Sequence, residues 1–256
     1  MSEYDWRNPA AYAYMNDYDA EGFGCEYLRR NEYFYKEYMT ASEDGEVNDA
    51  VASKWGFDFA PQNDLRMEPA LWTPAAFPRV LQLVLTTRNP RRSSEAIPLS
   101  RLSGADCRAT GDDLYVLWKP DKHPHRLIVA DGRRDGYFNA VLLPLDESFE
   151  TRLHAAGRFW RQMSGRPPGP DYGAFPPRSR QLAILTLRIF DARKAGASYR
   201  EIANALLSST PIAPRDWRDH PLKHRIRELL RKADRMIYHG GYHDLLFYPH
   251  RRGKRR

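Results

Sequence analysis

The stretch Pro221-Leu-Lys-His-Arg-Ile-Arg-Glu-Leu-Leu-Arg-Lys-Ala-Asp-Arg-Met-Ile-Tyr-His239 decides how the C-terminal part of this chain folds. Its apolar residues share one stripe about 100° wide, which is typical of a helix packed on a core. They are Leu222, Ile226, Leu229, Leu230, Ala233 and Ile237. Pro221 suits the first position of a helix, and Gly240 suits the left-handed residue just past its end. The stretch therefore predicts one amphipathic helix.

The face opposite this stripe is positively charged. It carries His224, Arg227, Arg231 and Arg235, flanked by Lys223, Arg225 and Lys232. Between Lys223 and Arg235, seven Lys, Arg or His residues stand against two acids, Glu228 and Asp234. A basic helix face is often only a solvated surface, but this excess is larger than solubility requires. The face therefore favours contact with a polyanion such as DNA.

Two further helices are predicted before the basic one. Ser198-Tyr-Arg-Glu201 is a capping box that begins a short helix. An earlier amphipathic helix ends near Ala195-Gly196. Helix, tight turn, capped helix, connector and basic helix is the order of a helix-turn-helix module, here over residues 178–246. The connector 208–220 is longer than the usual turn, so either the connector or the helix 221–239 could read the bases.

Charge is distributed unevenly along the 256 residues. Residues 1–77 contain 6 Lys/Arg against 15 Asp/Glu, a net of −9, whereas residues 78–256 contain 34 against 18, a net of +16. An acidic front and a basic back indicate separate tasks, with a polyanion as the partner of the back part. Two cysteines, Cys25 and Cys107, provide no disulfide framework, which favours the reducing cytoplasm. No apolar run approaches the roughly 20 residues of a membrane helix, so no membrane partner is expected.

The residue patterns predict an α+β chain with five parts. Residues 1–60 form an acidic, Tyr-rich helical unit for docking or oligomerisation, unless its aromatic residues are simply its core. Residues 61–78 form a connector, and residues 79–164 form a small antiparallel sheet followed by a helix. Residues 178–246 form the helix-turn-helix-like module, and residues 247–256 a basic tail. Five side chains of the helix at 148–163 are expected to point inward: Phe149, Leu153, Ala156, Phe159 and Trp160.

The motifs of common enzyme classes are missing from the sequence. It has no glycine-rich phosphate loop of the Walker type, no Gly-x-Ser-x-Gly elbow and no zinc-ligand spacing. We therefore expect neither catalysis, nor a cofactor, nor a metal. The basic tail is instead expected to grip phosphates through Arg251, Arg252, Lys254, Arg255 and Arg256.

The C-terminal residues resemble a bacterial domain family. Arg225-Ile-Arg-Glu-Leu-Leu-Arg-Lys-Ala233 and Gly240-Gly-Tyr-His-Asp-Leu-Leu246 are similar to the C-terminal signature of the RovC-type DNA-binding domain. That family includes regulators of type VI secretion and of integrative and conjugative elements in proteobacteria. The stretches Asp5-Trp-Arg-Asn-Pro-Ala-Ala-Tyr12 and Tyr27-Leu-Arg-Arg-Asn31 resemble the small domain that often precedes it. The resemblance implies a sequence-specific transcription regulator that can form a homo-oligomer.

The hypothesis is a cytoplasmic transcription factor, with double-stranded DNA as its partner and an activator role at a secretion or mobile-element operon. His224, Arg227 and Arg231 would lie nearest the base edges in the major groove. Lys223, Arg225, Lys232, Arg235 and Arg200, with the tail, would hold phosphates. The N-terminal unit would contact RNA polymerase, another regulator or a second copy. Two alternatives remain open, an antiactivator that binds another regulator and a DNA-bending accessory factor in element excision.

Overall fold

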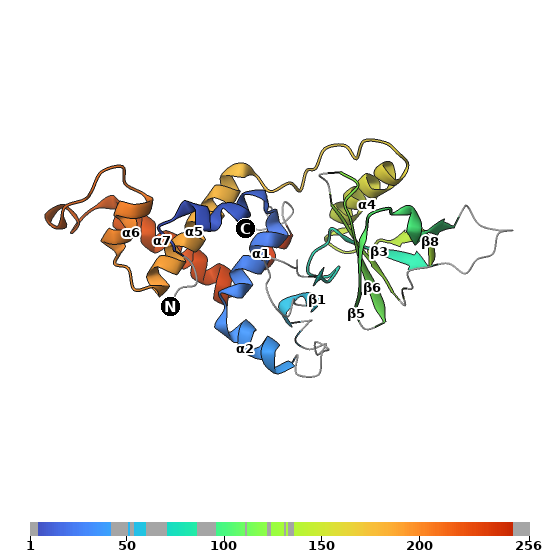
Figure 1. Ribbon diagram of the computed structural model, residues 1–256, viewed down its shortest axis with the longest axis horizontal. Helices are drawn as coiled ribbons and strands as arrows, with labels where there is room; N and C mark the ends of the chain where they lie inside the picture. Colours follow the sequence, from blue (N-terminus) through green and yellow to red (C-terminus); the bar gives the residue numbers. More distant parts are fainter. Residues whose placement is uncertain are drawn as a thin grey trace. The chain divides into compact units, whose positions relative to one another are not determined.

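The computed structural model describes residues 5–41, 51, 54–59, 71–85, 96–110, 112–121, 124–130, 132 and 136–247. The chain divides into two compact units (Figure 1). The helical unit lies within Met1–Tyr35 and Gly173–Tyr248, and the sheet unit lies within Lys36–Tyr172. All described strands lie in the sheet unit and most helices lie in the helical unit, and the predicted α+β class is confirmed.

The sheet unit is built around a six-stranded sheet with the strand order β4-β8-β3-β7-β6-β5. Its strands are β3 (Val80–Leu85), β4 (Ile97–Pro98), β5 (Asp106–Thr110), β6 (Asp113–Trp118), β7 (His125–Val129) and β8 (Tyr137–Leu142). A separate two-stranded sheet pairs β1 (Phe57–Phe59) with β2 (Leu71–Trp72), and a short 3-10 helix, η2, spans Leu99–Arg101. The strand β2 falls in the stretch expected to be a connector, of which residues 61–70 lie outside the described part.

The prediction of a small antiparallel sheet is wrong in two respects. The sheet has six strands, and its central pair, β3 and β7, is parallel, with Val80 opposite Arg126 and Leu83 opposite Val129. A parallel pair needs a long crossover, and the chain between Leu85 and His125 provides one by forming β4, β5 and β6 on the way. Turn signals along the sequence mark where strands end, but they do not say which strands become neighbours.

The helix α4 (Phe149–Met163) packs on one face of this sheet (Figure 1). Phe159 is 1% exposed and lies against Trp118, His125 and Phe138. The extent of this helix is close to the prediction, but the inward positions are partly wrong. Leu153 and Trp160 are 51% and 54% exposed. On a helix they lie about 120° and 100° from Phe159, outside the face that one sheet can cover.

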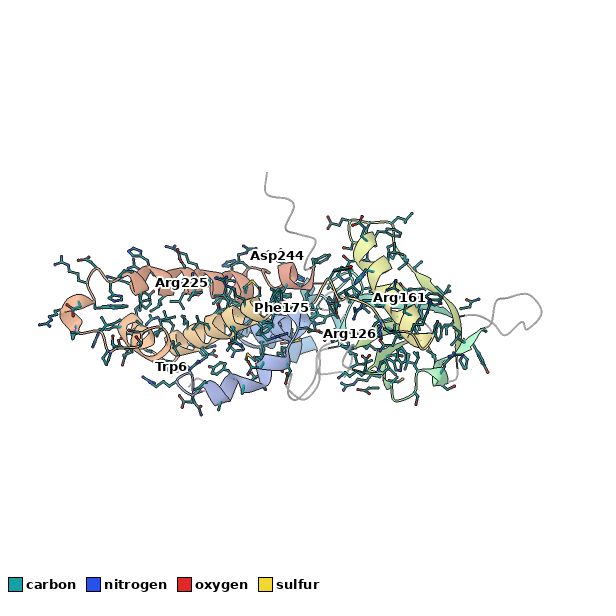
Figure 2. The ribbon with its side chains drawn as sticks, turned by 90° about the horizontal axis from the view of Figure 1, so that it is seen from above. Trp6, Arg126, Arg161, Phe175, Arg225 and Asp244 are labelled. Atoms are coloured by element: carbon teal, nitrogen blue, oxygen red, sulfur yellow. The ribbon has the colours of Figure 1, made fainter. Side chains whose placement is uncertain are left out.

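The helical unit combines the two ends of the chain. Its N-terminal elements are η1 (Pro9–Asp17), α1 (Ala20–Arg29) and the start of α2 (Glu32–Ala41). Its C-terminal elements are α5 (Pro177–Lys194), α6 (Tyr199–Leu206), η3 (Pro214–Asp216), α7 (Pro221–Tyr238) and α8 (His243–Leu246). Trp6 is 3% exposed and packs in one core with side chains of α5, α6 and α7, among them Ile189, Ile202 and Ile226 (Figure 2). The two ends of the chain therefore share one hydrophobic core.

A buried polar cluster joins the N-terminal elements to α5. Asp191 on α5 accepts hydrogen bonds from the Tyr12 hydroxyl at 2.8 Å and from Arg30 at 2.9 and 2.7 Å. Arg30 also contacts Glu26 at 2.7 Å. Burial alone would lower the pKa of the Arg30 guanidinium, but Asp191 and Glu26 hold that pKa well above its usual value. Each buried charge thus has an opposite charge beside it, as burial requires.

The local signals of the C-terminal sequence are confirmed. Ser198 caps α6 through the backbone N–H of Glu201, and the Glu201 carboxylate accepts from the Ser198 N–H. Pro221 stands in the first turn of α7, and Gly240 just beyond that helix has a φ of 67°. The helix-turn-helix interpretation itself stays a prediction, because the segment between α6 and α7 is much longer than the usual turn.

Candidate nucleic-acid interface

The buried side of α7 fixes which of its residues face outward. Ile226, Leu229, Ala233, Met236 and Ile237 are all buried, at most 5% exposed. The sequence stripe includes all of these except Met236. With this side held against the helical core, the opposite face can only point to solvent.

Two contacts fix the ends of α7 in the helical unit. The His220 ring accepts a hydrogen bond from the backbone N–H of Leu222 at 3.2 Å and so caps the first turn. At the other end, the Asn31 side chain donates to the Ile237 carbonyl at 2.6 Å. Helix termini leave backbone groups without partners inside the helix, and these contacts satisfy two of them. The N-terminal segment therefore helps to position the basic helix.

The outward face of α7 carries the predicted basic residues. Six of them are exposed: His224, Arg225, Arg227, Arg231, Lys232 and Arg235. Lys223 is half-buried and donates to the Arg218 carbonyl at 3.2 Å. The structure thus brings all seven basic α7 residues of the predicted site onto one helix, which extends for about 27 Å at 1.5 Å per residue.

Ion pairs divide this face into two groups. Arg225 lies 3.5 Å from Glu228, and Arg235 pairs with Asp244. His224, Arg227 and Arg231 have no hydrogen-bond or ion-pair partner among the described residues. These three lie within about 60° of one another on the helix and span about 10 Å along it, close to three base steps of DNA. They form an unpaired row, which we call the free row.

Lys232 follows Arg231 of the free row in the sequence, and burial and nearby charges shift the pKa of its side chain. Burial lowers the pKa of its ammonium group, and the positive charges of Arg225 and Arg235 lower it further. A phosphate bound at this position would stabilise the protonated lysine and oppose both effects. The electrostatics of this flank therefore favour an anionic partner.

The remaining predicted residues have different surroundings. Arg200 on α6 is half-buried, and its guanidinium donates to the Ile212 carbonyl at 3.3 Å. Asn204, also on α6, accepts from the Ile212 N–H at 2.9 Å. One side of α6 is therefore engaged in holding the connector. The five basic tail residues, Arg251, Arg252, Lys254, Arg255 and Arg256, lie outside the described residues.

The connector between α6 and α7 has an inner and an outer side. Trp217 packs against the helical core and stacks on the His220 ring, with a centroid distance of 5.8 Å. The Arg215 side chain, by contrast, is 88% exposed. Trp217 and His220 thus have structural roles, whereas the exposed Arg215 of the connector could reach DNA.

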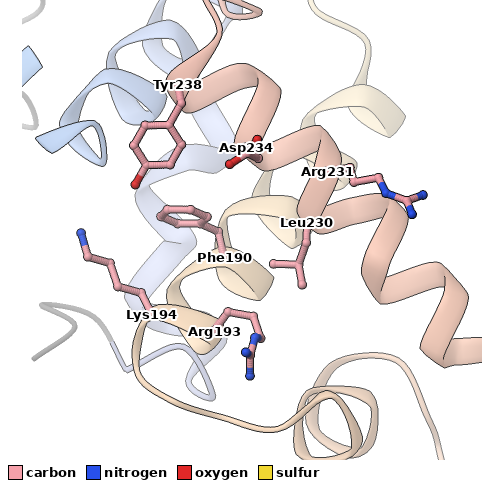
Figure 3. Close-up of a pocket in the computed structure, with 7 residues that line it drawn as sticks. All are labelled: Phe190, Arg193, Lys194, Leu230, Arg231, Asp234 and Tyr238. Atoms are coloured by element: carbon pink, nitrogen blue, oxygen red, sulfur yellow. The ribbon is translucent and has the colours of Figure 1, made fainter. Parts of the chain in front are cut away.

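Two basic residues near α7 were missed by the sequence reasoning. Arg193 and Lys194 form the last turn of α5 and line a pocket together with Arg231 of the free row (Figure 3). The signal in the sequence was weak, since two basic residues at the end of a helix are an ordinary response to the helix dipole. Only the packing of α5 against α7 shows that the two groups of charges are neighbours.

A helix that buries one face in a core and exposes a row of unpaired cations on the other has the electrostatic footprint expected of a DNA-binding element. Comparison with protein families agrees. Residues 142–246 match the family described as the T6SS transcription factor DNA-binding domain, and residues 5–60 match the proteobacterial transcriptional regulator-like domain. The two matches indicate a DNA-binding transcriptional regulator of the proteobacterial type.

The descriptions of both matched families are those of regulators, which fits the expectation that the chain is not an enzyme. A search of curated proteins found no match. Within the described residues, no helix is both long and apolar enough to cross a membrane.

Proposed function

We propose that this chain is a sequence-specific activator that reads its DNA site by placing α7 in the major groove. The observation that carries the proposal is the free row, His224, Arg227 and Arg231, which is exposed and unpaired in the described part of the chain. Arginine forms paired hydrogen bonds to O6 and N7 of guanine, and no group among the described residues competes for these side chains. The cytoplasm is the compartment in which such a protein meets DNA.

The packing of the helices favours α7 over α6 as the reading helix. α5, α6 and α7 all pack against one another. In three-helix variants of the helix-turn-helix, the third helix enters the major groove. α6 has only eight residues, and its Arg200 and Asn204 already contact the connector. α7 is longer, and its free row has no partner among the described residues.

The flanking charges would set the register of α7 on the DNA. We assign phosphate contacts to Lys223, Arg225, Lys232, Arg235 and Arg200, and to the basic tail. If about 6–10 phosphates are neutralised, affinity will fall about 10³–10⁵-fold between about 50 and 200 mM salt. Binding that does not depend on salt would contradict this arrangement.

We propose an operon of type VI secretion or of a mobile element as the target; the description of the matched family, which names type VI secretion, supports the first. The acidic N-terminal segment would then contact RNA polymerase, another regulator or a second copy of the chain. Two exposed tyrosines of α2, Tyr33 and Tyr35, are 63% and 60% exposed and could serve such a contact. Tyrosine suits an interface because one end of the ring is apolar and the other is polar.

The test is a genome-wide pull-down of DNA bound to the tagged protein, compared with an Arg227→Ala/Arg231→Ala double variant. Sharp peaks in the wild type that vanish in the double variant would support α7 as the reader. The matched control is Arg101→Ala/Lys119→Ala, which removes two exposed positive charges from the sheet unit. Its peaks should be those of the wild type.

Two outcomes would point to the other hypotheses. A folded wild-type protein without peaks that abolishes the DNA binding of another regulator would be an antiactivator. Peaks confined to the ends of a mobile element, with mobility that changes with the position of the site in a permuted fragment, would indicate a DNA-bending excision factor. Peaks at promoters with lowered transcript levels would contradict the activator role.

A further inference from the structure

A pocket with a volume of about 480 Å³ lies between α5 and α7 of the helical unit (Figure 3). This volume falls within the range of small-molecule sites, about 300–1,000 Å³. The pocket is next to the free row, because Arg231 belongs to both. No predicted contact with DNA explains why an apolar hollow should occur at this position.

The apolar part of the pocket is suited to a flat molecule. Phe190 from α5 and Tyr238 from α7 lie with their ring centroids 6.2 Å apart, and Leu230 completes this part of the lining. Tyr33 of α2 packs edge-on against Tyr238, with a centroid distance of 6.1 Å. Aromatic side chains prefer offset or edge-on contact with a further ring, which a planar ligand would provide.

The charged part of the pocket favours an anion. Arg193, Lys194 and Arg231 line it, against one acid, Asp234. Arg193 is held in place, since it donates to the Ala197 carbonyl and lies 5.0 Å from the Tyr199 ring centre. Lys194 is exposed and has no hydrogen-bond or ion-pair partner among the described residues. Lys194 and Arg231 are therefore two cations of the lining that no described group of the protein neutralises.

The Tyr238 hydroxyl adds a neutral donor to this edge of the pocket. Burial raises the pKa of Tyr238, and the carboxylates of Glu32 and Asp234 raise it further, so the phenol keeps its proton. Figure 3 shows the Lys194 ammonium group and the Tyr238 hydroxyl on the same side of the pocket, while Arg231 extends away from Phe190. Asp234 lines the α7 side of the pocket, whereas Lys194 lines the α5 side. Because the Asp234 carboxylate repels an anion, the anionic group of a ligand should lie toward Lys194.

We propose that this pocket binds a small planar organic anion, such as an aromatic carboxylate, and that a bound anion weakens DNA binding. The planar body would lie against Phe190, Leu230 and Tyr238, and the anionic group would face Lys194. α7 forms one wall of the pocket and Arg231 lines it, so a negative charge bound at Lys194 lowers the positive potential that the free row presents to DNA. The second half of this proposal rests on the proposed reading role of α7, and the first half does not.

The first experiment measures binding without DNA. The probe is 1-naphthoate, titrated into the full chain by calorimetry, with 1-naphthylmethanol as the same ring without charge and inorganic phosphate as charge without a ring. We expect saturable 1:1 binding of 1-naphthoate, tighter than either comparison compound by about tenfold or more, since a charge-assisted hydrogen bond and aromatic burial both contribute. Equal affinity for the acid and the alcohol, or no saturable binding, would overturn the site.

Variants locate the probe. Lys194→Glu should abolish naphthoate binding, and Phe190→Ala should weaken it, with thermal unfolding recorded to show that each protein is folded. Lys119→Glu makes the same charge change on an exposed residue of the sheet unit and should leave binding unchanged. Trp160→Ala removes an exposed aromatic side chain elsewhere and should also have no effect. Binding that survives Lys194→Glu, or that is lost with Trp160→Ala, would contradict the assignment.

The second experiment measures DNA affinity with and without saturating 1-naphthoate. If naphthoate weakens DNA binding, thermodynamic linkage requires DNA to weaken naphthoate binding by the same factor. We expect weaker DNA binding in the wild type and no effect of naphthoate in Lys194→Glu. Naphthoate binding without any change in DNA affinity would overturn the regulatory half while leaving the site intact. A chain that binds naphthoate but no DNA would instead contradict the proposed function.

Discussion

Arginines occur in two contrasting settings within the helical unit. Arg30 is 6% exposed and contacts two carboxylates, those of Glu26 and Asp191. Arg227 and Arg231 are exposed on α7 and contact no carboxylate in the described part of the chain. All three carry the same charge, but the first is satisfied inside the protein and the other two are available to a partner.

This difference separates charges that stabilise the fold from charges that bind. A buried ion pair holds segments together, and the loss of one member leaves the other uncompensated. An exposed, unpaired arginine contributes little to folding and retains its hydrogen-bonding capacity for a ligand. Substitutions in the two settings should therefore affect different measurements.

The largest effect is expected from Asp191→Ala. Removal of this carboxylate takes one of the two paired acids from Arg30 and the acceptor at 2.8 Å from the Tyr12 hydroxyl. The free energy of unfolding should fall by about 3–5 kcal/mol, as for other broken buried pairs. Urea unfolding followed by far-ultraviolet circular dichroism would measure it, because the helical unit contributes most of the helix.

Asp216→Ala is the matched control for this prediction. Asp216 belongs to the same unit, but its side chain is 61% exposed and lies 3.7 Å from Arg215, itself 88% exposed. Its removal should change the free energy of unfolding by no more than about 1 kcal/mol. Equal losses in the two variants would mean that the buried cluster does not hold the N-terminal segment to α5.

The next effect is expected from Arg227→Ala, in the opposite setting. The free energy of unfolding should stay within about 0.5 kcal/mol of the wild type. Binding to the specific DNA site should weaken by about 1–3 kcal/mol, with relaxed preference at one base position, if Arg227 contacts a base. Fluorescence anisotropy with a set of singly substituted DNA sites would measure both.

Arg225→Ala provides the comparison on the same helix. Arg225 already lies beside Glu228 and is assigned to a phosphate, so its loss should weaken binding to all sites equally. It should also reduce the slope of log affinity against log salt by about 0.9. A loss of base preference in Arg225→Ala rather than Arg227→Ala would shift the reading face toward the Glu228 side of α7.

A smaller effect is expected at the start of α6. Ser198→Ala removes the side-chain cap and should lower the free energy of unfolding by about 1 kcal/mol. The backbone N–H of residue 198 holds the pKa of Glu201 below its usual value of 4.5, and this bond survives in Ser198→Ala. Stability from this bond is present above pH 4.5 and is lost as the pH falls below the lowered pKa.

Glu201→Gln separates the two halves of the capping box. It removes the titrating group, so the part of the acid-induced loss of stability that comes from Glu201 should disappear, whereas it should persist in Ser198→Ala. Unfolding curves between about pH 3 and pH 7 would show the difference. An unchanged acid profile in Glu201→Gln would contradict a role for this bond in folding.

The sequence predicts the features that depend on neighbours along the chain. The capping box at Ser198, the first-turn Pro221 and the left-handed Gly240 are local signals, and the structure confirms all three. The contacts of Arg30 with Asp191 could not be predicted, because these residues are 161 positions apart and no periodicity links them. The parallel pairing of β3 with β7 was missed for the same reason.

The candidate site shows the same limit. Periodicity along α7 places the basic residues on one face, but only the three-dimensional contacts separate the free row from the paired charges. Periodicity also cannot show that Lys194, at the end of another helix, lines the same pocket as Arg231. Local sequence therefore predicts the direction in which a side chain points, whereas packing decides what it meets.

The smallest effect, and the closest test of the comparison, is expected from Glu228→Ala. Glu228 is an exposed acid on the basic face of α7, 3.5 Å from Arg225. Its loss should change the free energy of unfolding by less than about 1 kcal/mol, since exposed ion pairs contribute little. DNA affinity should increase, because Arg225 becomes unpaired and a negative charge leaves the phosphate-facing surface. Glu150→Ala, which removes an exposed acid on α4, should leave affinity unchanged in the same anisotropy assay.

If Glu228→Ala instead weakens binding to the specific site alone, Glu228 itself accepts a hydrogen bond from a cytosine amino group. The DNA-reading residues of α7 would then include Glu228, which does have a partner within the protein. The absence of such a partner would therefore no longer identify the α7 residues that bind DNA.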